Sequence, residues 1–546
     1  MLVSCVLSLL LAAWVHAGVG YTPQVATCPT TSLVRAADGL SDNEELFRAA
    51  RKALADEALK LWLARTDSAF DTGELPTASS SYGYVALTTS GGGYRSLLSG
   101  AGVIQALDGR DSSVSTSGLY QALTYQAGLS GGAWLLSSLA GNNYPTISYL
   151  KEKLWKRAFE DSLLVPANPL VALAYSEIQR DITEKESVGF DTTLTDPWGR
   201  LLSYQLLEGP FGGFETTLSS ITEFSNFTSY AVPFPLITAL GTKVWEGLCV
   251  PGPNATTYEF SPYEFGSWDK DVSAFTPTKY LGTTMKEGKP TGTCTTNYDN
   301  LGYILGTSSS LFNELCFSFP RPENLTTVLE ETLAGLLNNV HDLSNTDLFA
   351  TYRNPFYNYL SSTATPNVAN NVSAQDYLSL VDGGQSLQNN PIFPLLQPDR
   401  NVSVIFVNDN SADLSTNYPN GSEILTTYVQ SLNAGLTRMP FIPSVEIFLS
   451  MGLNTKATFF GCNDFDKVTI VYLPNTNYSY ASGTSTAQLA YSEEETDSMI
   501  TNGQQIATQG GDSGWATCLG CAVMMKTGQA LPGACPACFE EYCYYD

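Results

Sequence analysis

The sequence predicts a layered α/β fold with a partly parallel sheet, and three local patterns carry this prediction. A β-prone run followed by a glycine-rich turn and a helical stretch occurs at 84–107 and again at 123–139. A further two β-prone runs, 377–381 and 402–407, flank the turn Asp382-Gly383-Gly384. Strands that alternate with helices in this way favour parallel pairing, with helices covering the sheet.

Each element is predicted from its own local signals. Residues 41–65 form the first expected helix, because acidic residues open this stretch and basic residues close it. The run 84–89 predicts a strand, the glycine-rich residues 90–95 predict a turn, and 96–107 predict a helix with small residues on its packing face. The same order recurs as a strand at 123–127, a turn at 128–132 and a helix at 133–139.

Length and composition indicate one compact domain without a linker. The chain has 546 residues, of which 43% are hydrophobic and 15% are charged, as is typical of a protein with a large core. We expect a core over about 80–142 and 371–510 and a cysteine-rich tail over about 511–546. The irregular stretch of about 143–370, which is rich in aromatic residues and prolines, is expected to be a large insertion that caps the core.

The first 17 residues have the features of a cleaved signal peptide. They contain no charged side chain, carry an apolar run from Val6 to Val15 and end with Val15-His16-Ala17, where the small outer residues suit signal peptidase. No other segment approaches the roughly 20 apolar residues that a membrane span needs, and the end of the chain carries no hydrophobic anchor. We therefore expect a freely secreted, extracellular protein whose mature chain, 18–546, is a single domain.

Cysteines and sequons agree with export. Of the 11 cysteines Cys5 lies in the leader, which leaves an even number for disulfides in an oxidising compartment. The spacings Cys518-x-x-Cys521 and Cys535-x-x-Cys538 would also fit a zinc ribbon, but export favours disulfides, so we expect no metal. The tail holds five cysteines, so at least one pairs outside it or stays free. Glycosylation is expected at seven N-x-[ST] sequons, Asn226, Asn254, Asn324, Asn371, Asn401, Asn420 and Asn477.

The charge of the chain argues against anionic partners. The formal net charge is −26, so nucleic acid and an anionic membrane surface would both be repelled at neutral pH. Acidic clusters such as Glu493-Glu494-Glu495 are typical of a solvated face. We therefore expect no nucleic-acid partner.

Ser130 is the expected nucleophile. The stretch Gly128-Leu129-Ser130-Gly131-Gly132 fits the G-x-S-x-G elbow, in which a serine lies on a strained turn between a strand and a helix. A serine hydroxyl is a weak nucleophile until a base takes its proton. The chain has only two histidines, of which His16 lies in the leader and His341 in the expected insertion. A carboxylate is therefore the favoured base, with His341 as the alternative.

The glycine turn at 90–95 has three interpretations. It can form an oxyanion hole, because glycines let the backbone approach a substrate and the N–H groups at a helix start point toward negative charge. A dinucleotide or phosphate site is the rival, but Ser96 stands where G-x-G-x-x-G requires its third glycine. The turn can also serve only to bring a helix close to the sheet.

The residues alone do not select one acid as the base. Asp382 lies where an apolar strand ends in an abrupt turn, and an Asp-Gly turn without any chemical role has the same pattern. Many other acidic residues are available in the chain.

Three ordered sequence blocks resemble a known family and resolve this choice. The blocks 90–95 (SGGGYR), 127–134 (AGLSGGAW) and 380–384 (LVDGG), the last followed by Gln388-Asn389, are similar to the signature blocks of the fungal lysophospholipase or phospholipase B family. That family is related to the cytosolic phospholipases and, more distantly, to patatin. The resemblance spans nearly all of the mature chain and implies a patatin-like or cytosolic-phospholipase-like core. Gln385-Ser386 and Asn390 depart from the family pattern, which bears on substrate preference.

The resemblance also implies roles for individual residues. Ser130 is the nucleophile, Asp382 the base, Gly92 and Gly93 the oxyanion donors, and Arg95 a cation near the phosphate of the head group. For Asp382 to act as a base, its pKa should be raised above the usual value of about 3.9 by apolar surroundings. We then expect activity in mildly acidic medium, whereas an acidic limb near pH ~6.5 would implicate His341.

The expected function is the hydrolysis of fatty-acyl esters of lysophospholipids, with phospholipids as a further substrate class, through an acyl-serine and without a cofactor. Two alternatives stay open. A secreted esterase or lipase for neutral esters would use the same serine and aspartate but would be indifferent to Arg95. A lipid-binding glycoprotein without catalysis would keep the fold and lose the Ser-Asp dyad.

Overall fold

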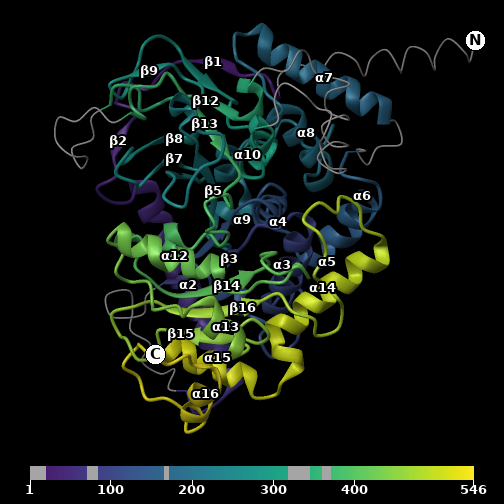
Figure 1. Cartoon of the computed structure of the whole chain (residues 1–546), viewed down its shortest axis with the longest axis vertical. Coiled ribbons are helices and arrows are strands. Elements are labelled where there is room, and N and C mark those ends of the chain that lie inside the picture. Colours follow the sequence, from purple (N-terminus) through teal and green to yellow (C-terminus); the bar gives the residue numbers. More distant parts are fainter. Residues whose placement is uncertain (1–19, 71–83, 165–170, 318–344, 360–370) are drawn as a thin grey trace, which may run out of the picture.

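A mixed sheet of twelve strands forms the centre of the molecule (Figure 1). The computed structural model describes residues 20–70, 84–164, 171–317, 345–359 and 371–546, so the expected signal peptide, His341 and Asn324 lie outside the described residues. Ten strands follow one another across the sheet in the order β15 (Thr458–Phe460), β16 (Thr469–Pro474), β14 (Val402–Asp409), β3 (Tyr84–Thr89), β4 (Tyr125–Gly128), β5 (Phe234–Gly241), β6 (Thr257–Phe260), β7 (Glu264–Ser267), β8 (Ala274–Pro277) and β2 (Arg35–Ala36). The other two, β12 (Ala350–Arg353) and β13 (Tyr377–Val381), pair with each other, and β13 also pairs with β5.

The middle of this sheet is parallel, as the sequence predicts. The strands β16, β14, β3, β4 and β5 run parallel to one another, whereas the other pairings in the sheet are antiparallel. Every residue of β4 and nearly every residue of β3 and β5 is buried, as expected for parallel strands covered on both faces. Two small ribbons lie apart from the sheet, β1 (Gln24–Ala26) with β11 (Cys294–Thr296) and β9 (Met285–Lys286) with β10 (Lys289–Pro290).

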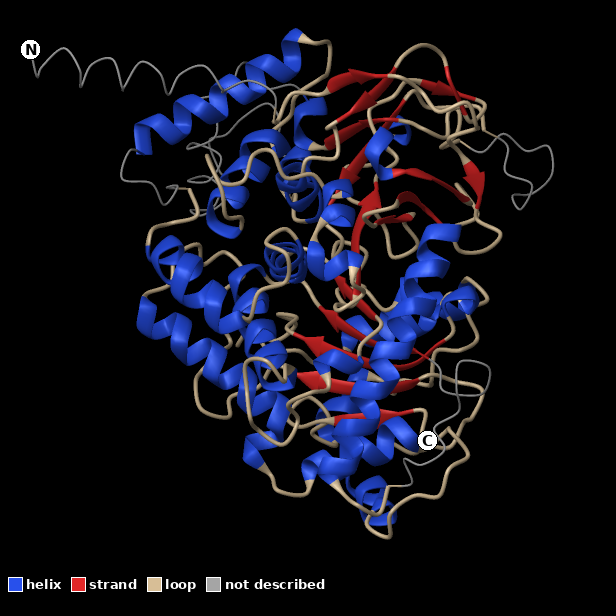
Figure 2. Ribbon diagram, turned by 180° about the vertical axis from the view of Figure 1, so that it is seen from behind, coloured by secondary structure: helices blue, strands red, loops and turns tan. Residues whose placement is uncertain are grey.

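Helices flank the strands on both sides (Figure 2). Among the described helices, none combines the length and apolarity that crossing a bilayer requires. The α-helices are α2 (Asp42–Thr66), α3 (Gly93–Leu107), α4 (Gly131–Ala140), α5 (Ile147–Leu150), α6 (Lys156–Glu160), α7 (Val171–Ser187), α8 (Thr195–Leu206), α9 (Ser225–Thr228), α10 (Leu301–Ser308), α12 (Ser422–Asn433), α13 (Val445–Ser450), α14 (Glu493–Thr508), α15 (Trp515–Met524) and α16 (Cys535–Tyr542).

Local signals explain the predicted helix starts. The side chain of Ser41 caps α2 by accepting a hydrogen bond from the Glu44 N–H, so this helix begins where the sequence predicts. Helix α3 begins at Gly93, three residues earlier than expected. The preceding Gly92 has φ 138°, a backbone conformation that favours glycine, and it turns the chain directly from the loop into the helix.

The predicted strands join the sheet at separate places. The strands at 377–381 and 402–407 both form, but β13 pairs with β12 and β5, while β14 pairs with β3 and β16. The stretch 143–370, which we expect to cap the core as an insertion, also supplies β5 to β8 and β12 to the same sheet. The strands β5 to β8 follow one another as antiparallel neighbours with no α-helix between them, so the strand–turn–helix order that marks β3 and β4 is absent from this part of the sequence.

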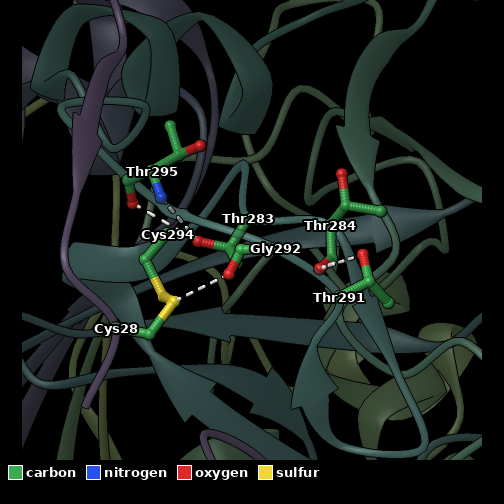
Figure 3. The surroundings of a disulfide bond; sticks show 7 residues. All are labelled: Cys28, Thr283, Thr284, Thr291, Gly292, Cys294 and Thr295. Atoms are coloured by element: carbon green, nitrogen blue, oxygen red, sulfur yellow. Dashed lines mark hydrogen bonds between the residues drawn. A yellow bond between two sulfur atoms is a disulfide. The ribbon is translucent and has the colours of Figure 1, made fainter.

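All ten cysteines of the described residues form disulfides. The pairs Cys518–Cys538 and Cys521–Cys535 staple α15 to α16, whereas Cys462–Cys543 ties the tail to the body, as the odd count in the tail predicts. The remaining pairs are Cys249–Cys316 and Cys28–Cys294. Figure 3 shows the last of these, which joins Cys28, just after β1, to Cys294, the first residue of β11. Nearby threonines bond to one another's backbone, and the Thr283 hydroxyl accepts from the Thr295 N–H at 2.9 Å.

The last residues of the chain extend the sheet beside β15. Phe459 of that strand forms an isolated parallel bridge with Cys543, and the Tyr544 N–H donates to the Phe459 carbonyl at 2.9 Å. The disulfide from Cys543 to Cys462 fixes this arrangement.

Glycines allow α3 and α14 to pack closely. A Cβ atom on Gly102 would lie 2.0 Å from the Ile500 carbonyl oxygen, and one on Gly503 would lie 2.2 Å from that of Ser99. Both obstacles are backbone atoms, which cannot move aside as a flexible side chain can. Helix α3, which follows the glycine turn, is therefore held between the sheet and α14.

We predict that Gly503→Ala destabilises the protein. The added methyl group would push the two helices apart, at a cost of about 1–3 kcal/mol, and should lower the midpoint of thermal unfolding by several degrees. Gly533→Ala is the matched control, because a Cβ atom there meets nothing within 4 Å. Equal midpoints for the two variants would contradict this account of the helix contact.

Candidate active site

Ser130 lies on a strained turn between β4 and α4. It is the N-cap of α4 and has φ 48° and ψ −124°, a conformation that is costly for any residue other than glycine. Its neighbours must be glycines because the backbone is crowded there. A Cβ atom on Gly131 would lie 2.2 Å from the Gly93 carbonyl oxygen, and one on Gly132 would lie 2.1 Å from that of Thr89. The elbow is thus pressed against the end of β3 and the glycine turn.

The glycine turn leaves two N–H groups without a protein acceptor. The Gly91 N–H donates to Asn389, to its carbonyl oxygen and its side-chain Oδ1, at 3.1 Å each. Within the described residues, the N–H groups of Gly92 and Gly93 donate to no acceptor. Because Gly131 follows Ser130 and abuts Gly93, these free donors lie beside the serine. This is what an oxyanion hole requires.

Asp382 follows directly after β13, and its side chain reaches Ser130. The carboxyl accepts a hydrogen bond from the Gly384 N–H at 2.6 Å, and the Ser130 hydroxyl lies near enough to lower its pKa as a second hydrogen-bond donor. Only 4% of the residue is exposed. Burial raises the pKa of this carboxyl to about 7, although the two hydrogen bonds oppose the shift. The direction agrees with the sequence-based expectation for a base.

A segment that the sequence did not single out holds Ser130 and Asp382 together. The Ser308 carbonyl accepts from the Ser130 N–H at 3.1 Å and from the Gly383 N–H at 3.2 Å. The Ser308 hydroxyl also accepts from the Ser130 N–H, at 3.0 Å, and donates to the Thr238 carbonyl. The next contact is at Ser310, whose carbonyl accepts from the Asp382 N–H at 3.0 Å. Only the run of small polar residues after α10 signals this segment in the sequence.

Arg95 is buried under the glycine turn and does not lie open to solvent. It is 1% exposed, its Nε donates to the Asn410 carbonyl at 2.9 Å, and its Nη1 donates to the Thr484 carbonyl at 2.6 Å. Burial lowers the pKa of the guanidinium to about 10, so the group stays charged at neutral pH. Asp409 and Asp413 oppose this shift through their charge. The expected contact with a phosphate remains a prediction.

The sequons differ in exposure. Asn254, Asn371, Asn401 and Asn477 are exposed, whereas Asn226 and Asn420 are half-buried. Asn226 also donates through Nδ2 to the Asn143 carbonyl at 2.7 Å, a bond that a glycan at this nitrogen would disturb. Glycosylation at these positions stays a prediction.

The arrangement can perform acyl transfer. A serine on a strained turn, a buried carboxyl within hydrogen-bonding reach and two free backbone donors are the parts that a serine hydrolase of the Ser-Asp type needs. Within the described ranges, no three His, Cys, Asp or Glu side chains gather in a way that could hold a metal ion.

Comparison with known proteins places the chain in a family. It belongs to the lysophospholipase catalytic domain family, whose model matches residues 85–546. A lysophospholipase of Arthroderma benhamiae is 39% identical over 96% of this chain and 86% of its own length. Lysophospholipase 3 of Aspergillus fumigatus is 38% identical over 98% of this chain and 90% of its own length. The family resemblance inferred from the three sequence blocks is therefore confirmed.

The fold is also confirmed by solved structures. Human GIVD cytosolic phospholipase A2 is similar with a TM-score of 0.68 and 18% identity, over 92% of this chain and 69% of that chain. The same human protein in complex with methyl gamma-linolenyl fluorophosphonate is similar with a TM-score of 0.61. At this level of identity the likeness concerns the fold, which is the cytosolic-phospholipase-like core that the sequence predicts.

We predict that Asp382→Asn stabilises the protein at pH 8 and has little effect at pH 4. The pKa of the carboxyl is about 7 in the folded protein and near 3.8 when unfolded, so ionisation costs the folded state stability as the pH rises between these values. The whole cost, at most about 4 kcal/mol, is present above pH 7. Thermal unfolding of both proteins at the two pH values measures it.

The exposed Asp376, which precedes β13, provides the control. Asp376→Asn removes a carboxylate close in sequence without removing a buried charge, and it should give no comparable gain at pH 8. A gain from Asp382→Asn that is equal at pH 4 and pH 8 would contradict the assigned burial cost.

Proposed function

We propose that this protein is a secreted lysophospholipase of the phospholipase B type. It hydrolyses the fatty-acyl ester of lysophospholipids, and of phospholipids as a second class, through an acyl-serine intermediate on Ser130. The observation that carries the proposal is the hydrogen bond between Ser130 and the buried Asp382, beside the free N–H groups of Gly92 and Gly93. The substrate class is supported by the names of the fungal relatives, which are lysophospholipases.

In the first step, Asp382 takes the hydroxyl proton as the Ser130 oxygen attacks the ester carbonyl. The carbonyl oxygen becomes an oxyanion, which accepts hydrogen bonds from Gly92 and Gly93. Each such donor is worth about 3 to 4 kcal/mol in the transition state. Because neither N–H donates elsewhere within the described residues, no internal hydrogen bond is exchanged when the oxyanion forms.

In the second step, the tetrahedral intermediate collapses and the ester C–O bond breaks. Asp382 returns its proton to the leaving glycerophospho-alcohol, and the acyl group stays on Ser130. Water then gives a proton to Asp382 and attacks the acyl-serine, which frees the fatty acid and restores the hydroxyl. The buried, apolar surroundings that raise the pKa of Asp382 also suit an acyl chain.

Export is part of the same proposal. The signal-peptide pattern of residues 1–17 and the five disulfides support an oxidising, extracellular compartment. We propose N-linked glycans on the exposed sequons in particular. The mass of the secreted protein before and after treatment with an N-glycosidase, together with N-terminal sequencing near Gly18, tests both points.

A carboxylic ester hydrolase for neutral lipids is the second candidate, because Ser130 and Asp382 would act in the same way on a monoacylglycerol. We predict that the wild type releases fatty acid from lysophosphatidylcholine faster than from a monoacylglycerol. Ser130→Ala should lose at least about a thousandfold in kcat on both. Preference for the monoacylglycerol would select the esterase, and activity that survives in Ser130→Ala would overturn the assigned nucleophile.

The base can be tested by pH. Since the pKa of Asp382 is raised to about 7, kcat/KM should fall as the pH drops below 7 and the carboxyl becomes protonated. A histidine would titrate in a similar range. The acidic limb of the pH–rate profile therefore does not by itself separate Asp382 from His341, whereas from the sequence we expect a limb near pH ~6.5 to implicate the histidine. We predict that His341→Gln keeps the limb and the rate, whereas Asp382→Asn loses at least about a thousandfold in kcat.

Arg95 is proposed to provide positive charge for the phosphate of the head group. Its guanidinium is already used by two backbone carbonyls, so a direct contact requires one of these bonds to be exchanged. We predict that Arg95→Lys lowers kcat/KM on lysophosphatidylcholine about tenfold more than on a monoacylglycerol, because lysine loses the planar, forked geometry. An equal loss of kcat/KM on both substrates would mean that Arg95 only holds the backbone around it and does not act on the phosphate.

A further inference from the structure

We propose that Asn389 is a positioning residue for the oxyanion hole and that Glu423 holds Asn389 in place. Asn389 fixes Gly91, and this keeps the N–H groups of Gly92 and Gly93 directed toward the substrate carbonyl. The inference rests on the proposed function, because it assigns a task within that same reaction.

The side chain of Asn389 binds both polar backbone groups of Gly91. Its Oδ1 accepts from the Gly91 N–H at 3.1 Å, and its Nδ2 donates to the Gly91 carbonyl at 3.2 Å. The backbone carbonyl of Asn389 accepts from the same Gly91 N–H at 3.1 Å. The side-chain amide of Asn389 thus accepts from the N–H and donates to the carbonyl of Gly91, which are the two bonds that a paired β-strand makes with one residue. With its polar groups bound, Gly91 cannot rotate without breaking these bonds.

Gly91 is also enclosed sterically. A Cβ atom on it would lie 2.4 Å from Oδ1 of Asn389 and 3.1 Å from Cβ of Ser130. Gly91 is therefore packed between the side-chain amide of Asn389 and Ser130. Since Gly91 directly precedes the two free donors, a shift of Gly91 moves Gly92 and Gly93 relative to Ser130. Misplacement of catalytic groups by about 1 Å can cost about a hundredfold in rate.

Two further contacts hold the amide itself. Its Nδ2 donates a second bond to the Ser411 hydroxyl at 2.9 Å, and that hydroxyl donates to Asp409 at 2.5 Å. The backbone N–H of Asn389 donates to Oε2 of Glu423 at 2.8 Å, from the first turn of α12. The oxyanion loop is in this way connected through Asn389 to the end of β14 and to α12.

Glu423 is a half-buried residue whose carboxyl has no cationic hydrogen-bond partner in the described residues. Burial and the charge of Asp413 raise its pKa to about 8, and Asp409 and Asp382 add to the shift. At neutral pH it is therefore mostly protonated and resembles a glutamine in shape and charge. In this geometry the Glu423 carboxyl accepts the hydrogen bond from the Asn389 N–H and so holds Asn389 in place.

Asn389→Leu tests the proposal, because leucine has the same branched arrangement of side-chain heavy atoms as asparagine but its side chain makes no hydrogen bonds. We expect kcat on the ester that Ser130 hydrolyses to fall about tenfold to a hundredfold, with KM changed less than about twofold. A trifluoromethyl ketone, whose adduct with serine bears an oxyanion, should bind more weakly by the same factor. An ether analogue of the substrate, which forms no oxyanion, should bind as it does to the wild type.

Asn433→Leu is the control. Asn433 is exposed at the end of α12, and its side chain donates to Gln430 at 3.2 Å, away from Ser130 and the glycine turn. The same substitution there should leave kcat within about twofold of the wild type. Active-site titration with a fluorophosphonate corrects both variants for inactive protein. Equal kcat values for the two variants, or a loss confined to thermal stability, would overturn the proposal.

Two further variants keep the test decisive if Asn389→Leu does not fold. Ser411→Ala removes one anchor of the amide and should lower kcat about threefold to tenfold without a change in KM; an unchanged kcat would overturn the proposal. Glu423→Gln keeps an acceptor for the Asn389 N–H and should lose much less activity than Glu423→Leu, and equal losses would remove Glu423 from the assignment. If the wild type shows no Ser130-dependent hydrolysis of any ester, the proposed function itself fails.

Discussion

The carbonyl oxygen of Ser308 is the point on which the geometry of the site depends. It accepts one hydrogen bond from the turn that carries Ser130 and a second from Gly383, next to Asp382. The nucleophile and the carboxyl come from parts of the chain about 250 residues apart, and they belong to strands β4 and β13, which are not adjacent in the sheet. The end of α10 lies between these turns and sets their separation, since both bond to one atom.

Close backbone approach and buried charge oppose each other in this site. Glycines let β3, the oxyanion turn and the elbow pack against one another with no side chains between them, and this excludes water. The same exclusion makes an ionised Asp382 costly and raises its pKa to about 7. In the proposed reaction this cost is tolerable, because Asp382 as the base only has to be ionised part of the time, and a base with a pKa near the working pH transfers protons efficiently in both directions.

The sequence predicted well those elements whose signals are local. The strand 84–89 and the helix capped by Ser41 match their predicted limits within one residue, because β-prone composition and a capping side chain act on neighbours. Ser130 was predicted from the G-x-S-x-G motif and Asp382 from the family resemblance, and both residues lie at strand ends in the structure. Ser308 was missed, since its contribution is a backbone carbonyl, which any residue carries. The pairing of β5 to β8 with the core was missed too, because pairing between distant strands leaves no local pattern.

The C-terminal residues have a consequence for how molecules behave in a crowded medium. Strand β15 is the last of the sheet and consists of Thr-Phe-Phe, a sequence that would readily pair with another chain if its outer backbone groups were open. Cys543 and Tyr544 occupy those groups, and the disulfide to Cys462 locks them there. The tail thus covers part of the outer edge of the sheet, and reduction of the Cys462–Cys543 disulfide would free the segment that covers this edge.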